Sequence, residues 1–150
     1  MAVTIGHYEH KLDSKNRLAI PPKYREALIA EKGSHFTLAL GIDDCITLFL
    51  PSQWENYLNS LNQEIRAYKN RSQARAIKRH IFQSAVEAPL DSQGRVLVPQ
   101  NLKDHAKLTK DVVVTGVGDK AEIWDRKNWE KYHKTQAIPS FQKLAKDLDL

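Results

Sequence analysis

The sequence predicts an α+β protein built from two similar units in tandem, and three observations support this prediction. Residues 12–21 (LDSKNRLAIP) return as residues 90–99 (LDSQGRVLVP). A Gly-x-x-Asp followed by a Trp-x-x-Tyr, at 41–44 and 54–57, also returns, at 116–119 and 129–132. Short apolar runs alternate in each unit with stretches of helical spacing. The second unit is three residues shorter between Pro99 and Gly116, as expected of a connection between elements.

Length and charge narrow the possibilities further. The chain has 150 residues, 41% of them hydrophobic and 27% charged, a composition typical of globular proteins. Each unit of about 75 residues is near the lower limit for burying a core alone, so the units should share a core or lean on neighbouring subunits. A net charge of +5 favours an anionic partner, either nucleic acid or an acidic protein, although a basic composition alone is weak evidence.

Two features that the sequence lacks bear on the cellular compartment of the protein. Cys45 is the single cysteine, so neither an internal disulfide nor a thiolate metal cluster is expected, and a reducing cytoplasmic setting fits. No apolar run approaches ~18 residues and no leader pattern precedes the first strand, so neither a membrane span nor a signal peptide is expected.

The first unit should begin with a hairpin, because residues 4–12 and 17–20 alternate in polarity around a four-residue turn. Asn16, and Gly94 in the second copy, should take the left-handed position of that turn. A helix should follow from the prolines at 21–22 to about Ala30, with Gly33 as its C-terminal cap.

Two apolar runs, 36–40 and 46–50, predict a second hairpin around residues 41–44. Ser52 and Glu55 resemble a capping box that opens a helix running to about Tyr68. The helical pattern restarts at Ser72 and continues through Ile81.

The second unit should repeat this plan. Strands are expected into Leu90 and over 95–98, 112–115 and 121–124, with a helix over 99–107 and a turn at 116–119. Asp125 should cap the next helix. Pro139 should interrupt the chain beyond that helix, and residues 141–148 have the spacing of a helical docking arm or of a partly disordered end.

The most basic stretch lies between the two units and contains no acid: Arg66, Lys69, Arg71, Arg75, Lys78 and Arg79. It is either the solvated face of a connecting helix or a set of phosphate contacts. We therefore divide the chain into a first repeat (1–63), a basic linking helical segment (64–84), a second repeat (85–133) and a C-terminal tail (134–150).

The aspartate of each repeated turn can have a structural role. A carboxylate at Asp13 or Asp91 can accept backbone N–H groups two or three residues further on, and it can pair with the motif arginine across the turn. The arginines are Arg17 and Arg95.

Two copies of Asp-Ser-x-[Asn/Gly]-Arg before an apolar strand and a proline, each followed by Gly-x-x-Asp and an aromatic pair, resemble the MraZ proteins of bacteria. The resemblance covers about residues 8–132. It implies two AbrB-like swapped-hairpin units that interleave into one pseudo-twofold β-barrel with flanking helices. It also implies a ring-shaped homo-oligomer at the nucleoid that regulates transcription. Such a ring would read tandem short repeats of double-stranded DNA in the promoter of the division and cell-wall gene cluster.

The resemblance places the family's DNA-contacting arginine on Arg17 and its acidic partner on Asp13, with Lys15 in the same turn. An arginine fork suits a guanine edge or a phosphate, and lysine acts as a point charge. Lys11 and Lys23 are candidate supporting phosphate contacts. Asn16 replaces the usual glycine of the motif, which puts affinity in doubt rather than fold.

An internal salt bridge that only fixes the turn is the alternative role for both motif arginines. We favour DNA contact for Arg17, and an internal bridge or a subunit contact for Arg95. Together with Asp91 and Gly94, Arg95 is thus assigned to the structure of the second turn.

Other candidate sites weaken on inspection. His7 and His10 should point to opposite faces of a strand, so no metal site is expected. The repeated Trp and Tyr residues favour core packing over base stacking. No catalytic constellation, cofactor loop or small-molecule site stands out.

Two further functions remain open. An AbrB-like antitoxin or transition-state regulator would usually carry one motif per chain. A structural or protein-interaction oligomer could use the basic helix against an acidic partner and bind the nucleoid without specificity.

Overall fold

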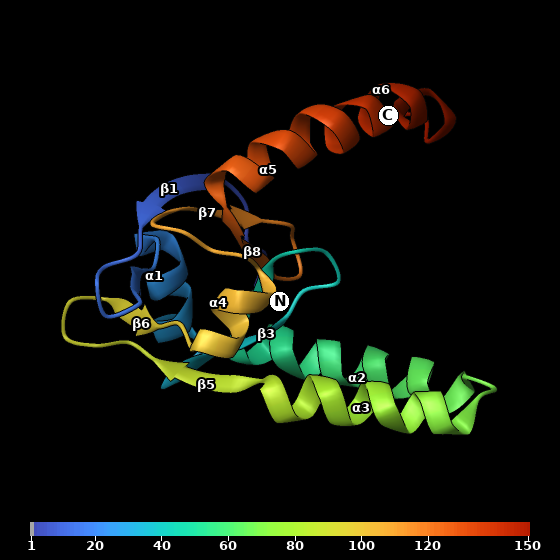
Figure 1. Cartoon of the computed structure of the whole chain (residues 1–150), viewed down its shortest axis with the longest axis horizontal. Coiled ribbons are helices and arrows are strands. Elements are labelled where there is room, and N and C mark those ends of the chain that lie inside the picture. Colours follow the sequence, from blue (N-terminus) through green and yellow to red (C-terminus); the bar gives the residue numbers. More distant parts are fainter. Residues whose placement is uncertain (1) are drawn as a thin grey trace.

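The computed structural model describes residues 2–150 and contains two antiparallel sheets with helices around them (Figure 1). Eight strands alternate with the helices along the chain. The larger sheet has six strands in the order β1(His7–Lys11), β7(Asp111–Gly116), β8(Ala121–Asp125), β4(Ile46–Phe49), β3(His35–Leu40) and β5(Val86–Pro89). The smaller sheet pairs β2(Arg17–Ala19) with β6(Arg95–Leu97).

Strand pairing joins the two halves of the sequence. β1 pairs with β7 and β5 pairs with β3, so each half lends its first strand to the other half. The β2–β6 and β4–β8 ladders also connect corresponding strands of the two halves. The pairing is therefore the same when the halves are exchanged, as expected of a duplicated sequence.

One core serves both halves, as the size of each unit suggested. Leu18 and Leu38 from the first half pack in the same buried cluster as Val96 and Ile123 from the second. All four side chains are at most 1% exposed. Because both halves contribute to one apolar cluster, neither half encloses a core of its own.

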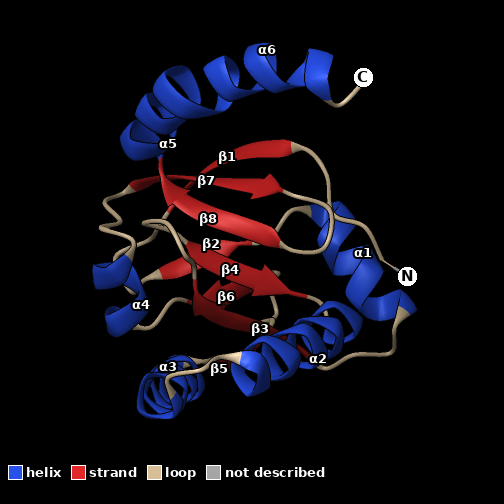
Figure 2. Ribbon diagram, turned by 90° about the vertical axis from the view of Figure 1, so that its right-hand side faces the viewer, coloured by secondary structure: helices blue, strands red, loops and turns tan. Residues whose placement is uncertain are grey.

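The helices surround the sheets on several sides. In Figure 2, α1 and α4 flank the sheets, α2 and α3 lie below them, and the helical end of the chain arches above. Their bounds are α1(Pro22–Ala30), α2(Pro51–Ala67), α3(Arg71–Ser84), α4(Gln100–His105), α5(Arg126–Tyr132), the π-helix η1(His133–Ala137) and α6(Ile138–Asp147).

The expectation of a closed barrel is wrong. The large sheet is open, with β1 and β5 as its edges, and β2–β6 forms a separate ladder. Closure would require hydrogen bonding between the two edge strands. In the part of the chain that the structure describes, β1 pairs only with β7 and β5 only with β3.

The predicted pairing of the first hairpin is wrong. Asp13 N–H donates to Arg17 O at 3.1 Å and closes the turn, but the strands on either side then separate. β1 continues to β7 and β2 to β6. Alternating polarity identifies strands but not their partners. The hairpins at 41–44 and 116–119 are confirmed, because β3 pairs with β4 and β7 with β8.

Two predicted helix caps are wrong. Lys32, with φ of 54°, takes the left-handed position after α1, and a Cβ on Gly33 would lie 2.6 Å from Leu28 Cδ1. Glycine is thus needed at position 33 because a side chain there would collide with Leu28. At α2, Pro51 occupies the first helical position, so Leu50 is the N-cap and Gln53 accepts its N–H at 3.1 Å.

Ser52 lies two residues after the N-cap Leu50 and instead donates its hydroxyl to Glu31 Oε2 at 2.6 Å. By contrast, the predicted cap at Asp125 is confirmed, since its side chain accepts Asn128 N–H at 3.3 Å.

Pro139 does not interrupt the chain's last helical region. It lies in the first turn of α6, and the helical region continues through it. The π-helix η1 precedes it, with Ile138 N–H bonded to His133 O. The helical alternative for residues 141–148 is confirmed through Asp147, and the apolar side chains of α6 remain exposed.

Candidate nucleic-acid interface

Two turns define the candidate site: the first turn (residues 13–17) and the second turn (residues 91–95). Both project on one side of the molecule, at the left of Figure 1, while α2, α3 and α6 extend to the other side. The β2–β6 ladder holds them together, because Arg17 pairs with Leu97 and Ala19 with Arg95. A single rigid edge therefore carries both copies of the repeated motif.

Asp13 organises the first turn through both carboxylate oxygens. Its Oδ1 accepts the N–H groups of Lys15 and Arg17, each at 2.9 Å, and its Oδ2 accepts Arg17 Nε at 2.8 Å. The backbone N–H of Arg17, together with that of Lys15 and the guanidinium, outweighs partial desolvation and lowers the pKa of Asp13. The carboxylate stays ionised and fixes the arginine.

The second turn repeats this geometry. Asp91 Oδ1 accepts Gln93 N–H at 2.8 Å and Arg95 N–H at 3.0 Å, and Oδ2 accepts Arg95 Nε at 3.0 Å. Its pKa is lowered for the same reason, with the Arg95 N–H as the largest cause. Asn16 (φ 59°) and Gly94 (φ 73°) hold the expected left-handed positions.

One contact breaks the symmetry between the turns. Arg95 Nη1 donates to Asp13 Oδ2 at 3.3 Å, so the second arginine bonds to the acids of both turns. Among residues 2–150, Arg17 makes no equivalent bond to Asp91. The internal salt bridge favoured for Arg95 is present, and it also ties the second turn to the first.

Arg17 keeps part of its guanidinium available. The Arg17 side chain is 35% exposed. Among the described residues its only hydrogen-bond partner is Asp13, which accepts from Nε, and the backbone N–H of Arg17 also donates to Asp13. Both terminal nitrogens are therefore free to donate, in the fork that a guanine edge or a phosphate accepts. Lys15, two residues earlier, is exposed.

The two supporting lysines fall in different places. Lys11 ends β1 at the base of the first turn, and its Nζ lies 3.8 Å from Asp111 Oδ1 with 69% of the side chain exposed. Lys23 is an exposed residue in the first turn of α1. That helix lies against the second turn, because a Cβ on Gly94 would meet Arg25 Nη1 at 2.7 Å. The structure thus groups Lys11, but not Lys23, with the first turn.

Two lysines at the site were not identified from the sequence. A cavity of about 350 Å³ lies beside the first turn, and its lining includes Lys103 and Lys110 together with Ser14 and Asn16. Lys103 Nζ donates to Asn16 Oδ1 at 3.0 Å. A signal did exist, since Lys103 stands 78 positions after Arg25, the offset of the repeated motif.

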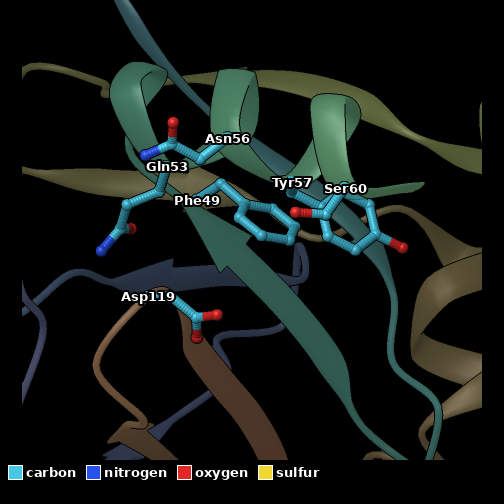
Figure 3. A pocket seen from close by; sticks show the side chains of 6 residues that line it. All are labelled: Phe49, Gln53, Asn56, Tyr57, Ser60 and Asp119. Carbon is cyan, nitrogen blue, oxygen red and sulfur yellow. The ribbon is translucent and has the colours of Figure 1, made fainter. Parts of the chain in front are cut away.

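A second cavity, of about 110 Å³, lies between α2 and the turn that carries Asp119 (Figure 3). Phe49, Gln53 and Tyr57 are part of its lining. This lining contains an acid and no lysine or arginine, so it does not suit an anionic ligand.

The basic stretch of α2 and α3 is exposed, and one of its members has a structural role. Arg71 Nη1 donates to the carbonyl oxygens of Ile65, Arg66 and Tyr68, at 2.9–3.1 Å. It therefore satisfies carbonyls at the C-terminal end of α2. The side chains of Arg75, Lys78 and Arg79 have no hydrogen-bond partner in the described chain.

The repeated aromatic residues pack against one another, as core packing predicts. Phe49 and Tyr57 have ring centroids 4.8 Å apart, and Trp124 and Tyr132 are 4.9 Å apart. Trp54 and Trp129 join these two clusters. The starts of α2 and α5 are held to the sheet in this way.

Residues 2–150 contain no group of three His, Cys, Asp or Glu side chains placed to hold a metal ion. His7 and His10 lie on opposite faces of β1, one exposed and one half-buried. In the same described part of the chain, every helix is too short or too polar to cross a bilayer.

Comparisons with known proteins agree on one family. The model of the family described as "MraZ protein, putative antitoxin-like" matches residues 4–79 and 81–150. A protein of Caldanaerobacter subterraneus subsp. tengcongensis named "Transcriptional regulator MraZ" is 40% identical over 145 residues, covering 97% of this chain and 96% of that protein. Proteins of the same name from Thermoanaerobacter sp. (39%, 97% and 96%) and Alkaliphilus oremlandii (40%, 94% and 93%) are similar to the same extent.

Proposed function

This chain belongs to the MraZ family, and on that premise we propose that it is a sequence-specific DNA-binding regulator of transcription. Its relatives carry the name of transcriptional regulators. The observation that supports the proposal most directly is Arg17, which Asp13 holds through Nε while its terminal nitrogens stay free. Base-edge recognition requires a donor fork that is fixed in this way.

In this proposal the first turn enters a groove of double-stranded DNA, with Arg17 and Lys15 at its tip. Lys11 adds a phosphate contact from the base of the turn, and Lys23 adds one from α1. Asp13 and Asn16 keep the turn in shape. Asp91, Gly94 and Arg95 form a second turn that supports the first, through the bond from Arg95 to Asp13.

We also propose that the target is a set of tandem short repeats in the promoter of the division and cell-wall gene cluster, and that the regulator is a cytoplasmic, nucleoid-associated homo-oligomer. A single turn offers few contacts. Several copies on one assembly would meet successive repeats, and avidity would multiply their affinities.

Two apolar surfaces support assembly into a ring. A groove of about 280 Å³ lies between α2 and α3, with Leu61, Ile65 and Ile77 in its lining. On α6, the side chains of Phe141 and Leu144 are 65% and 45% exposed. The groove of one chain can accept the apolar side chains of α6, the α6 stripe, from the next chain. Such head-to-tail contacts form a ring when the rotation between neighbouring subunits closes.

The swapped-hairpin relationship and the division into repeats also belong to the proposal. Exchange of β1 and β5 between the halves supports the AbrB-like interpretation. Repeats at 1–63 and 85–133 would be joined by the segment 64–84 and followed by the tail 134–150. The first boundary lies inside α2, which continues to Ala67, so this helix would belong to both the repeat and the linking segment.

The test is to titrate wild type and Arg17→Ala against a duplex from the promoter region upstream of the protein's own gene, and against a scrambled duplex of equal length. We expect wild type to prefer the promoter duplex at high salt and Arg17→Ala to lose that preference. A bidentate base contact is worth about 1–3 kcal/mol, and several copies multiply the effect.

Arg126→Ala is the matched control, because Arg126 also uses Nε in an i,i+4 ion pair, at 3.4 Å from Glu130. This variant should bind like wild type. Circular dichroism and sedimentation should show Arg17→Ala folded and assembled. If DNA binding were lost only together with assembly, Arg17 would be an assembly residue.

The second candidate function is a protein-interaction oligomer that binds the nucleoid without specificity. The observation that favours it is the row of exposed cations on α3, which an acidic surface of any kind could meet. Equal, salt-sensitive binding to both duplexes would support this alternative.

A further inference from the structure

We propose that the cavity beside the first turn is a seat for a backbone phosphate of DNA, formed by Lys103 and Lys110 from the second half of the chain with Ser14 from the first. The inference rests on the proposed function and adds residues to the same site. It gives the second half a direct part in DNA binding. It also explains why the first turn would face DNA.

The chemistry of the cavity suits an anion. Lys110 and the Ser14 hydroxyl line it and have no side-chain partner in the described part of the chain. Lys103 is half-buried and held by Asn16 Oδ1 at 3.0 Å, so its ammonium group is already oriented. An ammonium group has three donors, and two of them remain for a ligand.

The one acid in the lining does not repel an anion strongly. Asp13 is bonded to two arginines, at 2.8 Å from Arg17 Nε and 3.3 Å from Arg95 Nη1. The two guanidinium groups balance the two carboxylates of the turns, Asp13 and Asp91, so Lys103 and Lys110 supply the net positive charge at the cavity.

The corresponding place beside the second turn lacks this set of cations. Lys11 in the first copy corresponds to Pro89 in the second. Lys11 pairs with Asp111 and Pro89 pairs with His35, so Asp111 corresponds to His35. The residues just before them, Lys110 and Ser34, therefore correspond as well. Lys15 in the first turn corresponds to Gln93 in the second.

Only Lys103 has a basic counterpart there, Arg25. Arg25 Nε donates to Ile20 O at 3.2 Å, which engages part of its guanidinium within the protein. Three lysines thus distinguish the first turn from its copy: Lys11, Lys15 and Lys110.

A phosphate at this position would fix how the turn lies on the duplex. Phosphate contacts set register and orientation but carry no base information. With Lys103 and Lys110 on the backbone, Arg17 at the neighbouring tip would be directed toward the base edges.

Lys110→Gln is the cleanest test, because no hydrogen bond among the described residues depends on its ammonium group. Its affinity for the promoter and scrambled duplexes should fall by the same factor. The slope of log K against log salt should become shallower by about 0.9 for every phosphate contact removed. Lys103→Gln should behave in the same way.

Two control variants accompany this experiment. Lys143→Gln removes an exposed lysine of α6, a helix that extends away from the turns (Figure 1), and should leave the slope unchanged. Lys103→Arg keeps a cation at this position, so comparing it with Lys103→Gln separates damage to the turn from loss of the charge. It should retain the wild-type slope.

The outcomes separate the two proposals. If the Lys110 and Lys103 variants keep the wild-type slope while Arg17→Ala loses promoter preference, the phosphate seat is wrong and the proposed function stands. Loss of promoter preference in Lys110→Gln with an unchanged slope would make Lys110 a base-reading residue, which also overturns the seat. If wild type binds neither duplex, the proposed function fails first.

Discussion

Each turn is built by a few residues whose functional groups satisfy one another. Asp13 accepts two backbone N–H groups and one guanidinium N–H within five residues, and Asn16 adopts the left-handed φ that closes the turn. These requirements are local, so the same residue types produce the same geometry at Asp91 and Gly94. The turn therefore exists independently of what it binds.

The lowered pKa of Asp13 predicts a pH dependence of stability. The folded-state pKa lies below the unfolded value of about 3.9, so ionised Asp13 stabilises the fold above that pH. This contribution is lost as pH falls below about 4 through the folded-state pKa. Urea unfolding of Asp13→Asn should accordingly vary less with pH in this range than unfolding of wild type.

Carboxyl ¹³C NMR would measure the titration directly. Midpoints for Asp13 and Asp91 should both fall below the reference value of 3.8. A midpoint for Asp13 at or above 3.8 would mean that the turn's hydrogen bonds do not persist in solution.

At the scale of elements, helix ends are where three-dimensional contacts outweigh local patterns. Gln53 begins α2 by accepting Leu50 N–H, and its Nε2 donates to Gly118 O at 3.3 Å. The side chain is 2% exposed. It thus joins the start of α2 to the β7–β8 turn, a contact that no local capping pattern could indicate.

Gln53→Ala should lower the free energy of unfolding by about 1–3 kcal/mol, because it leaves buried hydrogen-bonding groups without a partner. Urea denaturation at neutral pH measures the loss. Ser52→Ala is the comparison, since it removes a partly buried hydrogen bond to Glu31 and leaves the buried network intact. A larger loss in Ser52→Ala than in Gln53→Ala would restore Ser52 as the cap.

At the scale of the whole molecule, the two halves form one body with unequal ends. Cross-pairing of strands and a shared core fix both turns at one end. The helices α2 and α3, which form the apolar groove, and α6, which carries the exposed apolar side chains, extend at the other end (Figure 1). DNA binding and assembly would therefore use separate surfaces, and it should be possible to disrupt either one alone.

Phe141→Ser with Leu144→Ser tests the assembly surface. Removing two exposed apolar side chains from the stripe should reduce the mass measured by sedimentation or light scattering toward that of one chain. DNA affinity should then fall toward that of a single turn, because avidity is lost. Lys143→Ser, on the same helix but outside the apolar stripe, is the control. An unchanged mass in the double variant would exclude α6 from the interface.

Features that depend on residues near one another in sequence were predictable. The duplication, most strands and helices, the hairpins at 41–44 and 116–119, and the left-handed Asn16 and Gly94 all follow from local patterns. The bond between Arg17 and Asp13 belongs here too, because four residues of turn bring the two side chains together.

Tertiary structure alone decided which strands pair, that the sheet is open, and which distant groups meet at the first turn. Arg95 reaches Asp13 from 82 positions away, and Lys103 reaches Asn16 from 87. The sequence by itself determined the two turns and the arginine in each. It could not determine how the two turns differ. That difference depends on which residues of one half the shared core places beside the turn of the other half.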